Sequence, residues 1–285
     1  MKRNKLHIHW YPGHIAKAER QLKEKLSLVD VVIEVRDARI PLSSSYADIK
    51  KLLGDKPRLL LLNKSDLVNK LDLNRWIDYL KADTQCPVIV TEAKNGGSNV
   101  TRIVNEAIRL AEPKIQALMA KGLLRRAARA IVVGMPNVGK SSIINRLTKS
   151  SKTKTGAKAG VTRQQQWVRI NPKLDLLDTP GIIPTKQDDQ IQAAKLAFVS
   201  SVSENAYSPE PVAQALLDML SEGEYKGTVS DYYKTDVLTL ENIACSRNWI
   251  IKSEMPDTER TAKYILKDFR EGKIGKFILD DIPEN

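Results

Sequence analysis

The sequence predicts an α/β protein in which a mostly parallel, doubly wound sheet is followed by a small all-α domain. Two observations lead to this prediction. Short apolar runs alternate with segments whose apolar residues recur at helical spacing, which is the pattern of βαβ units. Beyond about Pro184 the helical pattern continues without a convincing strand. We therefore expect two domains, residues 1–185 and residues 186–285.

The expected strands are short and apolar, like strands buried inside a parallel sheet. They cover residues 29–35, 58–62, 87–90 and 130–133. A hairpin is expected from residues 165–170 and 173–177, which Asn171-Pro172 joins. The expected helices cover residues 73–81, 99–110, 189–201, 211–221 and 256–271, and one more helix with a basic face is expected across residues 113–129.

Composition favours a soluble protein in a reducing compartment. The chain has 285 residues, and its two cysteines, Cys86 and Cys245, lack the spacing of a disulfide framework or a zinc ribbon. Residues 1–11 hold no apolar core of a secretion signal, and no stretch approaches the ~20 apolar residues of a membrane span. We expect a cytoplasmic protein without a membrane partner.

Positive charge is concentrated in the first part of the chain. Residues 1–185 carry a net charge of +18 and residues 186–285 carry −6, within a total of +12. No acidic residue occurs between Glu112 and Asp175, an interval that holds 14 lysines and arginines. Like charge at this density destabilises a fold unless water or a polyanion neutralises it. A solvated basic surface is one interpretation; we favour a surface that binds RNA.

Residues 134–141, Gly-Met-Pro-Asn-Val-Gly-Lys-Ser, match the phosphate loop G-x-x-x-x-G-K-[ST] and follow an expected strand, as the motif requires. Glycines allow the tight turn that points backbone N–H groups at a phosphate. Lys140 adds a positive charge that serves binding and catalysis, and Ser141 offers a hydroxyl to Mg²⁺. The residues expected to contact the nucleotide here are Pro136, Asn137, Val138, Gly139, Lys140, Ser141 and Ser142.

Residues 63–66, Asn-Lys-Ser-Asp, match N-K-x-D, the element that recognises guanine. Asp66 is expected to accept hydrogen bonds from guanine N1 and the exocyclic amine, and this carboxylate would face an acceptor if adenine bound instead. Asn63 and Lys64 would brace the loop and the base plane. Ala93 and Lys94 match the A-K pair of a second guanine loop, although Glu92 replaces its usual small residue.

These elements occur in an inverted order. Ordinary GTPases have the phosphate loop first and the guanine element last, whereas here the guanine element comes first and Asp178-Thr179-Pro180-Gly181 comes last. A site in space does not depend on where the chain is cut, provided that the old termini are joined. The sequence therefore predicts a circularly permuted P-loop GTPase domain, with GTP as substrate and Mg²⁺ as cofactor.

The switch segments predict how the triphosphate is sensed. Asp178 is expected to hold Mg²⁺ through water, and the N–H of Gly181 to meet the γ-phosphate and assist catalysis. Thr162 is expected to close on Mg²⁺ in the GTP state, the alternative being an ordinary loop threonine. Ile182 stands where Ras-like enzymes have a water-orienting glutamine, and an alkyl side chain cannot hold a water. His14 is the best candidate to replace it; a surface or capping histidine is the alternative.

Four features of the chain point to one family: the motif order, the opening 10–18 (Trp-Tyr-Pro-Gly-His-Ile-Ala-Lys-Ala), the segment 36–41 (Arg-Asp-Ala-Arg-Ile-Pro) and the phosphate loop. In these features, and over nearly its whole length, the chain resembles the YlqF/RbgA family of circularly permuted ribosome-assembly GTPases. The resemblance implies that His14 serves hydrolysis and that Asn137 is associated with a K⁺ ion. It also implies a factor in late maturation of the large ribosomal subunit, which binds the subunit precursor and ribosomal RNA and is a monomer off the ribosome.

The family's helical C-terminal domain contributes to RNA binding, whereas residues 186–285 of this chain are net acidic. We therefore expect either contact with ribosomal protein or a local basic face made of Lys263, Lys267, Arg270, Lys273 and Lys276.

The chain leaves the GTPase domain just after Gly181, so we expect the nucleotide state to orient the C-terminal domain. GTP would favour binding to the precursor, and hydrolysis of GTP to GDP would release the factor. The alternative is a GTP-gated RNA-binding scaffold in which hydrolysis is incidental. A signalling or transport GTPase fits the basic interval less well.

Overall fold

A computed structural model describes residues 8, 12–46, 48–92, 99–149, 167–178, 181–182, 189–252 and 254–284. Its strands form one seven-stranded sheet in the order β3-β2-β1-β4-β6-β5, and β7 also pairs with β4. All pairs are parallel except β5 with β6, which form the expected hairpin. The strands are β1 Val31–Asp37, β2 Arg58–Asn63, β3 Val88–Thr91, β4 Ala128–Gly134, β5 Trp167–Asn171, β6 Leu174–Leu177 and β7 Gly181–Ile182.

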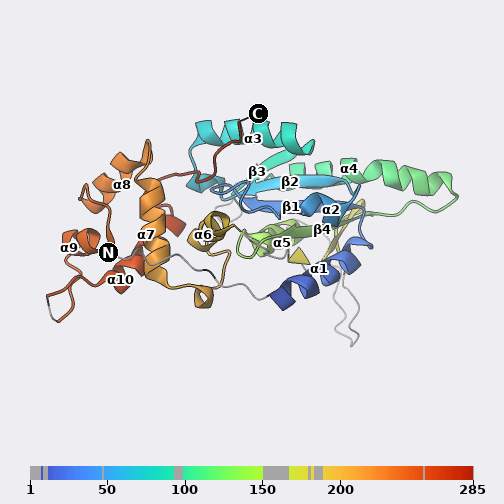
Figure 1. Ribbon diagram of the computed structural model, residues 1–285. Coiled ribbons are helices and arrows are strands. Elements are labelled where there is room, and N and C mark those ends of the chain that lie inside the picture. Colours follow the sequence, from blue (N-terminus) through green and yellow to red (C-terminus); the bar gives the residue numbers. More distant parts are fainter. Residues whose placement is uncertain are drawn as a thin grey trace.

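Helices connect these strands and then continue alone. The α-helices are α1 Pro12–Leu26, α2 Ile49–Leu53, α3 Lys70–Thr84, α4 Val100–Ala120, α5 Lys140–Lys149, α6 Gln190–Phe198, α7 Pro209–Leu220, α8 Tyr225–Tyr233, α9 Leu240–Ser246 and α10 Thr258–Arg270. Helices α7 to α10 gather at the left in Figure 1, beyond one end of the sheet, while the end of α4 projects at the right. The α/β fold is therefore as predicted.

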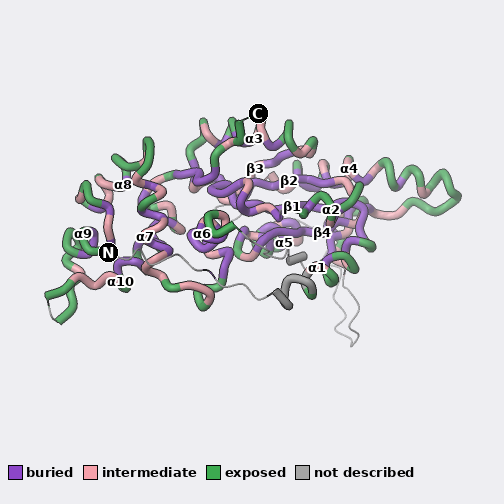
Figure 2. The backbone as a smooth tube through the Cα atoms, viewed as in Figure 1, coloured by how far each residue is buried: buried purple, intermediate pink, exposed green. Residues whose placement is uncertain are grey.

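Both faces of the sheet are covered, which explains why its strands are apolar without alternation. In β2, Leu60 and Leu62 pack beneath α3 against Trp76, in the smaller of two buried clusters. Leu59 and Leu61 belong to the larger cluster, which also includes residues of α1 and α4. Figure 2 shows the resulting layer of buried residues through the centre of the sheet.

Helix α4 extends beyond the helix expected at residues 99–110, but it ends before residue 129, where the expected basic helix would end. It runs through Pro113, whose ring removes one helical hydrogen bond, and ends at Ala120. Residues 123–127 lie outside any helix, so the prediction of a helix across 113–129 is wrong beyond residue 120. Leu124, in this return segment, is 94% exposed.

The region after β7 is helical, as predicted, although α8 and α9 were not expected from the sequence. Capping side chains fix where two of its helices begin: Asp189 accepts from the N–H of Ile191, and Asp257 from the N–H of Arg260. No named strand occurs within residues 189–252 and 254–284. The larger buried cluster is continuous from β4 to α6 and α7, and the division at 185/186 stays a prediction.

Candidate guanine-nucleotide site

The phosphate loop joins β4 to α5 and is shaped by two glycines. A Cβ on Gly134 would lie 2.5 Å from the carbonyl oxygen of Val35, on the neighbouring strand β1. Gly139 has a φ of +104°, and a Cβ there would lie 2.1 Å from Nδ2 of Asn63. Neither position tolerates a side chain, so the loop can approach its neighbours closely only with glycine.

Lys140 begins α5 and is largely buried under the loop. Its Nζ donates to the carbonyl oxygen of Met135 over 2.6 Å. Burial lowers the pKa of Lys140 to about 8. Ser141 and Ser142 follow on the exposed side of the helix start, where a hydroxyl is accessible to a bound cation.

The guanine element lies against this loop. Nδ2 of Asn63 donates to the carbonyl oxygen of Val138 over 2.8 Å. Its Oδ1 accepts from the hydroxyl of Thr91 at the end of β3, 3.0 Å away. Asn63 therefore connects the carboxyl ends of β2 and β3 to the phosphate loop, and segments 75 residues apart meet at one edge of the sheet.

Lys64 and Asp66 follow at the same edge. Lys64 has a left-handed backbone with φ +63° and precedes the 3₁₀ turn Ser65–Leu67, which carries Asp66. The Nζ of Lys64 lies 2.8 Å from the Asp37 carboxylate, which is fully buried. Nothing in the sequence predicted this contact; Asp37 follows the apolar run 29–35 and Arg36.

Strand β7, which contains Gly181, lies beside the phosphate loop in the sheet. Gly181 pairs with Val133 and Ile182 with Gly134, so β7 runs beside the start of the loop. Asp178 is exposed just after β6, which pairs with the first half of β4. Helix α1 contacts β7, and its first turn includes the backbone of His14. The side chain of His14 lies outside the described part, as do Ala93, Lys94 and Thr162.

The helical region contacts the phosphate loop directly, which sequence reasoning missed. The Asn137 amide donates to the carbonyl oxygen of Ser200 over 2.6 Å. The hydroxyl of Ser201 donates to the carbonyl oxygen of Pro136 over 2.8 Å. Both serines belong to the turn that ends α6. Sequence patterns do not predict such a contact, because serine is common in turns.

Several cations of the basic interval already have acidic partners. Arg126 and Lys114 lie 2.6 and 2.8 Å from the buried Asp30 carboxylate, and Arg125 lies 2.8 Å from Glu112. Arg169 pairs with Asp175 across the hairpin. These four cations therefore have acidic partners within the protein, which the sequence analysis did not predict.

The expected basic face on the last helix also needs correction. Arg270 points inward: it donates to the carbonyl oxygens of Ala197 and Phe198 and pairs with Glu204 at 2.8 Å. It closes the end of α6 against α10 rather than facing solvent. Lys263 and Lys273 each pair with a glutamate, and like Lys267 and Lys276 they are exposed.

Known proteins resemble this chain over nearly its full length. "Ribosome biogenesis GTPase A" of Bacillus cereus is 37% identical over 279 residues, covering 96% of this chain and 93% of the relative. The protein of the same name from Priestia megaterium is 38% identical, covering 97% and 98%. "Mitochondrial GTPase 1" of Aedes aegypti is 32% identical, covering 96% and 94%.

Solved structures of YlqF from Thermotoga maritima have a similar fold. The form bound to GNP has a TM-score of 0.64 at 26% identity and covers 94% of this chain and 100% of that one. The GDP-bound form of YlqF gives the same score and identity. A family model described as "50S ribosome-binding GTPase" matches residues 129–231, from the phosphate-loop strand onward.

None of the helices in the described ranges combines the length and apolar character needed to cross a bilayer.

Proposed function

Because this chain belongs to the YlqF/RbgA family of ribosome biogenesis GTPases and is a GTP hydrolase, we propose that it acts in late maturation of the large ribosomal subunit. It binds the subunit precursor and its ribosomal RNA in the GTP state, and it leaves after hydrolysis. Off the ribosome it is a monomer, and it works in the cytoplasm. The names of the relatives support the ribosomal partner.

The bond between Asn63 and Val138 carries the nucleotide part of this proposal, since it joins the guanine element to the phosphate loop. Asp66 then reads the base, with Asn63 and Lys64 bracing it. A cradle that admits no Cβ at Gly134 or Gly139 fits a phosphate group. The phosphates contact residues Pro136 to Ser142. Ala93 and Lys94 contribute to the base pocket.

Mg²⁺ neutralises charge on the phosphates when it is bound. Ser141 would hold it directly, Asp178 through water, and Thr162 in the GTP state. Ser141 is exposed in the first turn of α5 and Asp178 is exposed just after β6, which fits this role. Lys140 stabilises the transferring phosphoryl group. Its hydrogen bond to the Met135 carbonyl oxygen supports this role, because it keeps the ammonium group at the phosphate loop.

Hydrolysis needs a group that orients the attacking water, and we assign this role to His14. Helix α1 lies beside β7, the strand of Gly181, which senses the γ-phosphate through its N–H. Asn137 uses its amide nitrogen to contact Ser200, so its oxygen is not consumed by that bond and is compatible with a K⁺ ion. Replacing His14 with alanine should lower ribosome-stimulated turnover and leave nucleotide affinity intact.

Orientation of the helical region depends on the loop that binds the phosphates. The contacts of Ser200 and Ser201 with Asn137 and Pro136 provide a direct path, in addition to the segment after Gly181. A change in the loop on binding GTP therefore shifts the position of α6, and with it the surface presented to the subunit precursor.

The test is co-sedimentation with large-subunit particles in GTP, GDP and a non-hydrolysable analogue. Sedimentation with GTP and the analogue but not GDP is expected, and equal binding in all three would overturn the switch. Asp66→Asn is the matched control. Its amide suits xanthine, which has a carbonyl oxygen where guanine has an amine, so XTP should restore what GTP no longer supports.

The scaffold alternative keeps the same site but makes hydrolysis incidental. Ile182, in the position of the missing glutamine, is compatible with it. A His14→Ala chain that binds the precursor and still completes subunit maturation in cells would favour the scaffold over the hydrolytic switch.

A further inference from the structure

Asp37 is a fully buried carboxylate at the last position of β1, surrounded by cations. Arg39 donates to it from Nε over 2.9 Å and from a terminal nitrogen over 2.8 Å, one bond to each carboxylate oxygen. The N–H of Arg39 donates as well, over 3.1 Å. The Nζ of Lys64 lies 2.8 Å from the Oδ2 that Arg39 also contacts. Arg39 thus fixes the carboxylate, and the carboxylate faces Lys64.

The sheet register explains why these groups meet. Asp37 is paired with Asn63 across the β1–β2 ladder, and the N–H of Ala38 donates to the Asn63 carbonyl oxygen over 2.9 Å. Asp37 therefore lies beside the first residue of the guanine element. Lys64 adopts a left-handed backbone conformation, which residues other than glycine adopt mainly where surrounding contacts hold them. The ion pair with Asp37 is such a contact.

The charge state of Asp37 suits a permanent anchor. Burial by itself would raise its pKa, but Arg39 and Lys64 together hold that pKa below its ordinary range. Asp37 is thus an anion at any physiological pH, so it is unsuited to proton transfer. The Asp37 carboxylate is fully buried and the Lys64 side chain is 24% exposed, so this pair is screened by water less than a pair of exposed side chains.

The helical region supports the other side of Arg39. The guanidinium lies over the ring of Phe269, 5.4 Å from its centroid, and donates to the carbonyl oxygen of Arg270 over 3.4 Å. The N–H of Leu279 donates to the Arg39 carbonyl oxygen over 2.8 Å. The end of α10 and the residues after it therefore brace the residue that orients Asp37.

We propose that Asp37 is a positioning residue of the guanine pocket, whose carboxylate, oriented by Arg39, holds the ammonium group of Lys64 where the base plane is bound. The inference rests on the proposed role of Lys64 in guanine binding. Its effect falls on nucleotide affinity and not on the chemical step, because Lys64 belongs to the element proposed to bind the base and not to the phosphate loop.

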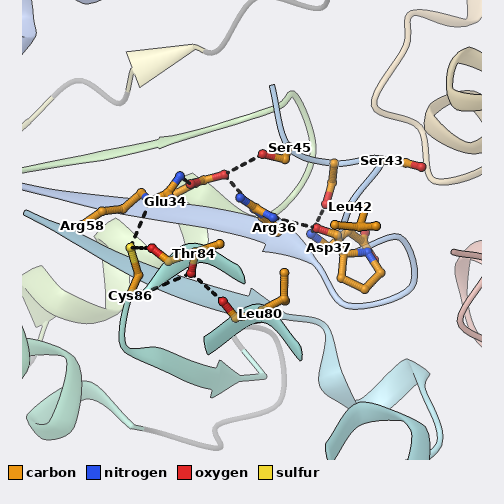
Figure 3. A network of polar contacts seen from close by, with 12 residues as sticks. Glu34, Arg36, Asp37, Leu42, Ser43, Ser45, Arg58, Leu80, Thr84 and Cys86 are labelled. Carbon is orange, nitrogen blue, oxygen red and sulfur yellow. Dashed lines mark hydrogen bonds and ion pairs between the residues drawn. The ribbon is translucent and has the colours of Figure 1, made fainter. Parts of the chain in front are cut away.

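Glu34 provides a matched control on the same strand. It is also fully buried and paired with two arginines, Arg36 at 2.7 Å and Arg58 at 2.9 Å (Figure 3). Its ladder partner on β2 is Leu60, which precedes the guanine element. Asp37→Asn and Glu34→Gln each remove one buried charge and keep the shape of the side chain. Loss of stability should be similar in both, while loss of nucleotide affinity should occur only in Asp37→Asn.

The experiment measures the GDP dissociation constant, the KM for GTP, kcat at saturating GTP and the melting temperature of the full chain. For Asp37→Asn we expect the dissociation constant and KM to rise about tenfold with kcat within about twofold of wild type. Glu34→Gln should leave both binding values within about twofold. An Asp37→Asn chain with unchanged GDP affinity would overturn the proposal, as would equal losses in both variants.

Lys64→Met separates this proposal from the one on which it rests. If Lys64→Met leaves GDP affinity unchanged, the assignment of the guanine element fails. If Lys64→Met weakens binding and Asp37→Asn does not, only the role of Asp37 fails. The double variant should bind no more weakly than Lys64→Met alone, because each change removes the same interaction.

Should Asp37→Asn fail to fold, lysine nitrogen-15 NMR of the wild-type chain decides. The Lys64 ammonium signal, assigned by its loss in Lys64→Met, should keep its protons in slow exchange with and without GDP. Fast exchange, as in an exposed lysine, would refute the pairing.

Discussion

Nucleotide binding to this protein should take up part of a proton near pH 8, because burial lowers the pKa of Lys140. Burial lowers the pKa of its ammonium to about 8, and its Nζ donates a hydrogen bond to the neutral carbonyl of Met135. Phosphate oxygens beside Lys140 would raise that pKa, since nearby negative charge favours the charged form. The direction is therefore uptake, not release.

The magnitude follows from the fraction of Lys140 that is neutral in the free protein. With a pKa of about 8, roughly one tenth of the molecules are neutral at pH 7, about half at pH 8 and about nine tenths at pH 9. Binding of GDP should thus take up about 0.1 proton at pH 7 and about 0.5 proton at pH 8. The GDP affinity should fall with rising pH across this interval.

Isothermal titration calorimetry in buffers of different ionisation enthalpy measures the number of protons directly. Lys140→Arg is the informative variant, because a guanidinium stays protonated and the uptake at pH 8 should vanish. Lys149→Arg, at the exposed end of the same helix, should leave the uptake unchanged. A wild-type value near zero at pH 8 would refute the reasoning and indicate that Lys140 is fully protonated in the free protein.

Three further outcomes are expected. Gly139→Ala should abolish detectable GDP binding, since the new Cβ would lie 2.1 Å from Nδ2 of Asn63; fluorescence titration checks this, and retained affinity would refute the close approach. Ser201→Ala should speed GDP release about fivefold by removing the bond to the Pro136 carbonyl, as stopped-flow would measure; an unchanged rate would mean that α6 does not brace the loop. Burial would raise the pKa of Asp30, but hydrogen bonds from Arg126 and Lys114 lower it from 3.8 to about 2. The resulting stabilisation, up to about 2 kcal/mol, is complete above pH 4 and is lost as the pH falls through 2. The free energy of unfolding of Asp30→Asn should therefore depend less on pH between 4 and 2 than that of the wild type. An unchanged pH dependence would contradict the lowered pKa of Asp30.

The sequence anticipated the sheet and most helices because their patterns are local. Apolar runs located β1 to β4, and Asn171-Pro172 located the hairpin. The patterns failed where the outcome depended on distant packing. Residues 123–127 were expected to belong to a helix across 113–129, yet they lie outside any helix because the chain returns to the start of β4.

Site residues divide in the same way. The phosphate loop and the guanine element were recognisable because each needs particular residue types at fixed spacing within one turn of chain. Their meeting through Asn63 and Val138 follows from parallel strands that end at one edge. Asp37 was visible as part of a segment typical of the family, but nothing in its neighbours indicated that its partner is Lys64.

By itself, then, the amino-acid sequence determined the nucleotide class, the inverted order of the binding elements and the α/β architecture, because these depend on short-range spacing and on hydrophobic periodicity. Only the tertiary structure decided which charges are already neutralised inside the protein. Asp30 forms ion pairs with Lys114 and Arg126, and Arg270 donates a hydrogen bond to the Ala197 carbonyl oxygen of α6. Ion pairs between residues far apart in the chain depend on strand order and helix packing, which no local pattern specifies.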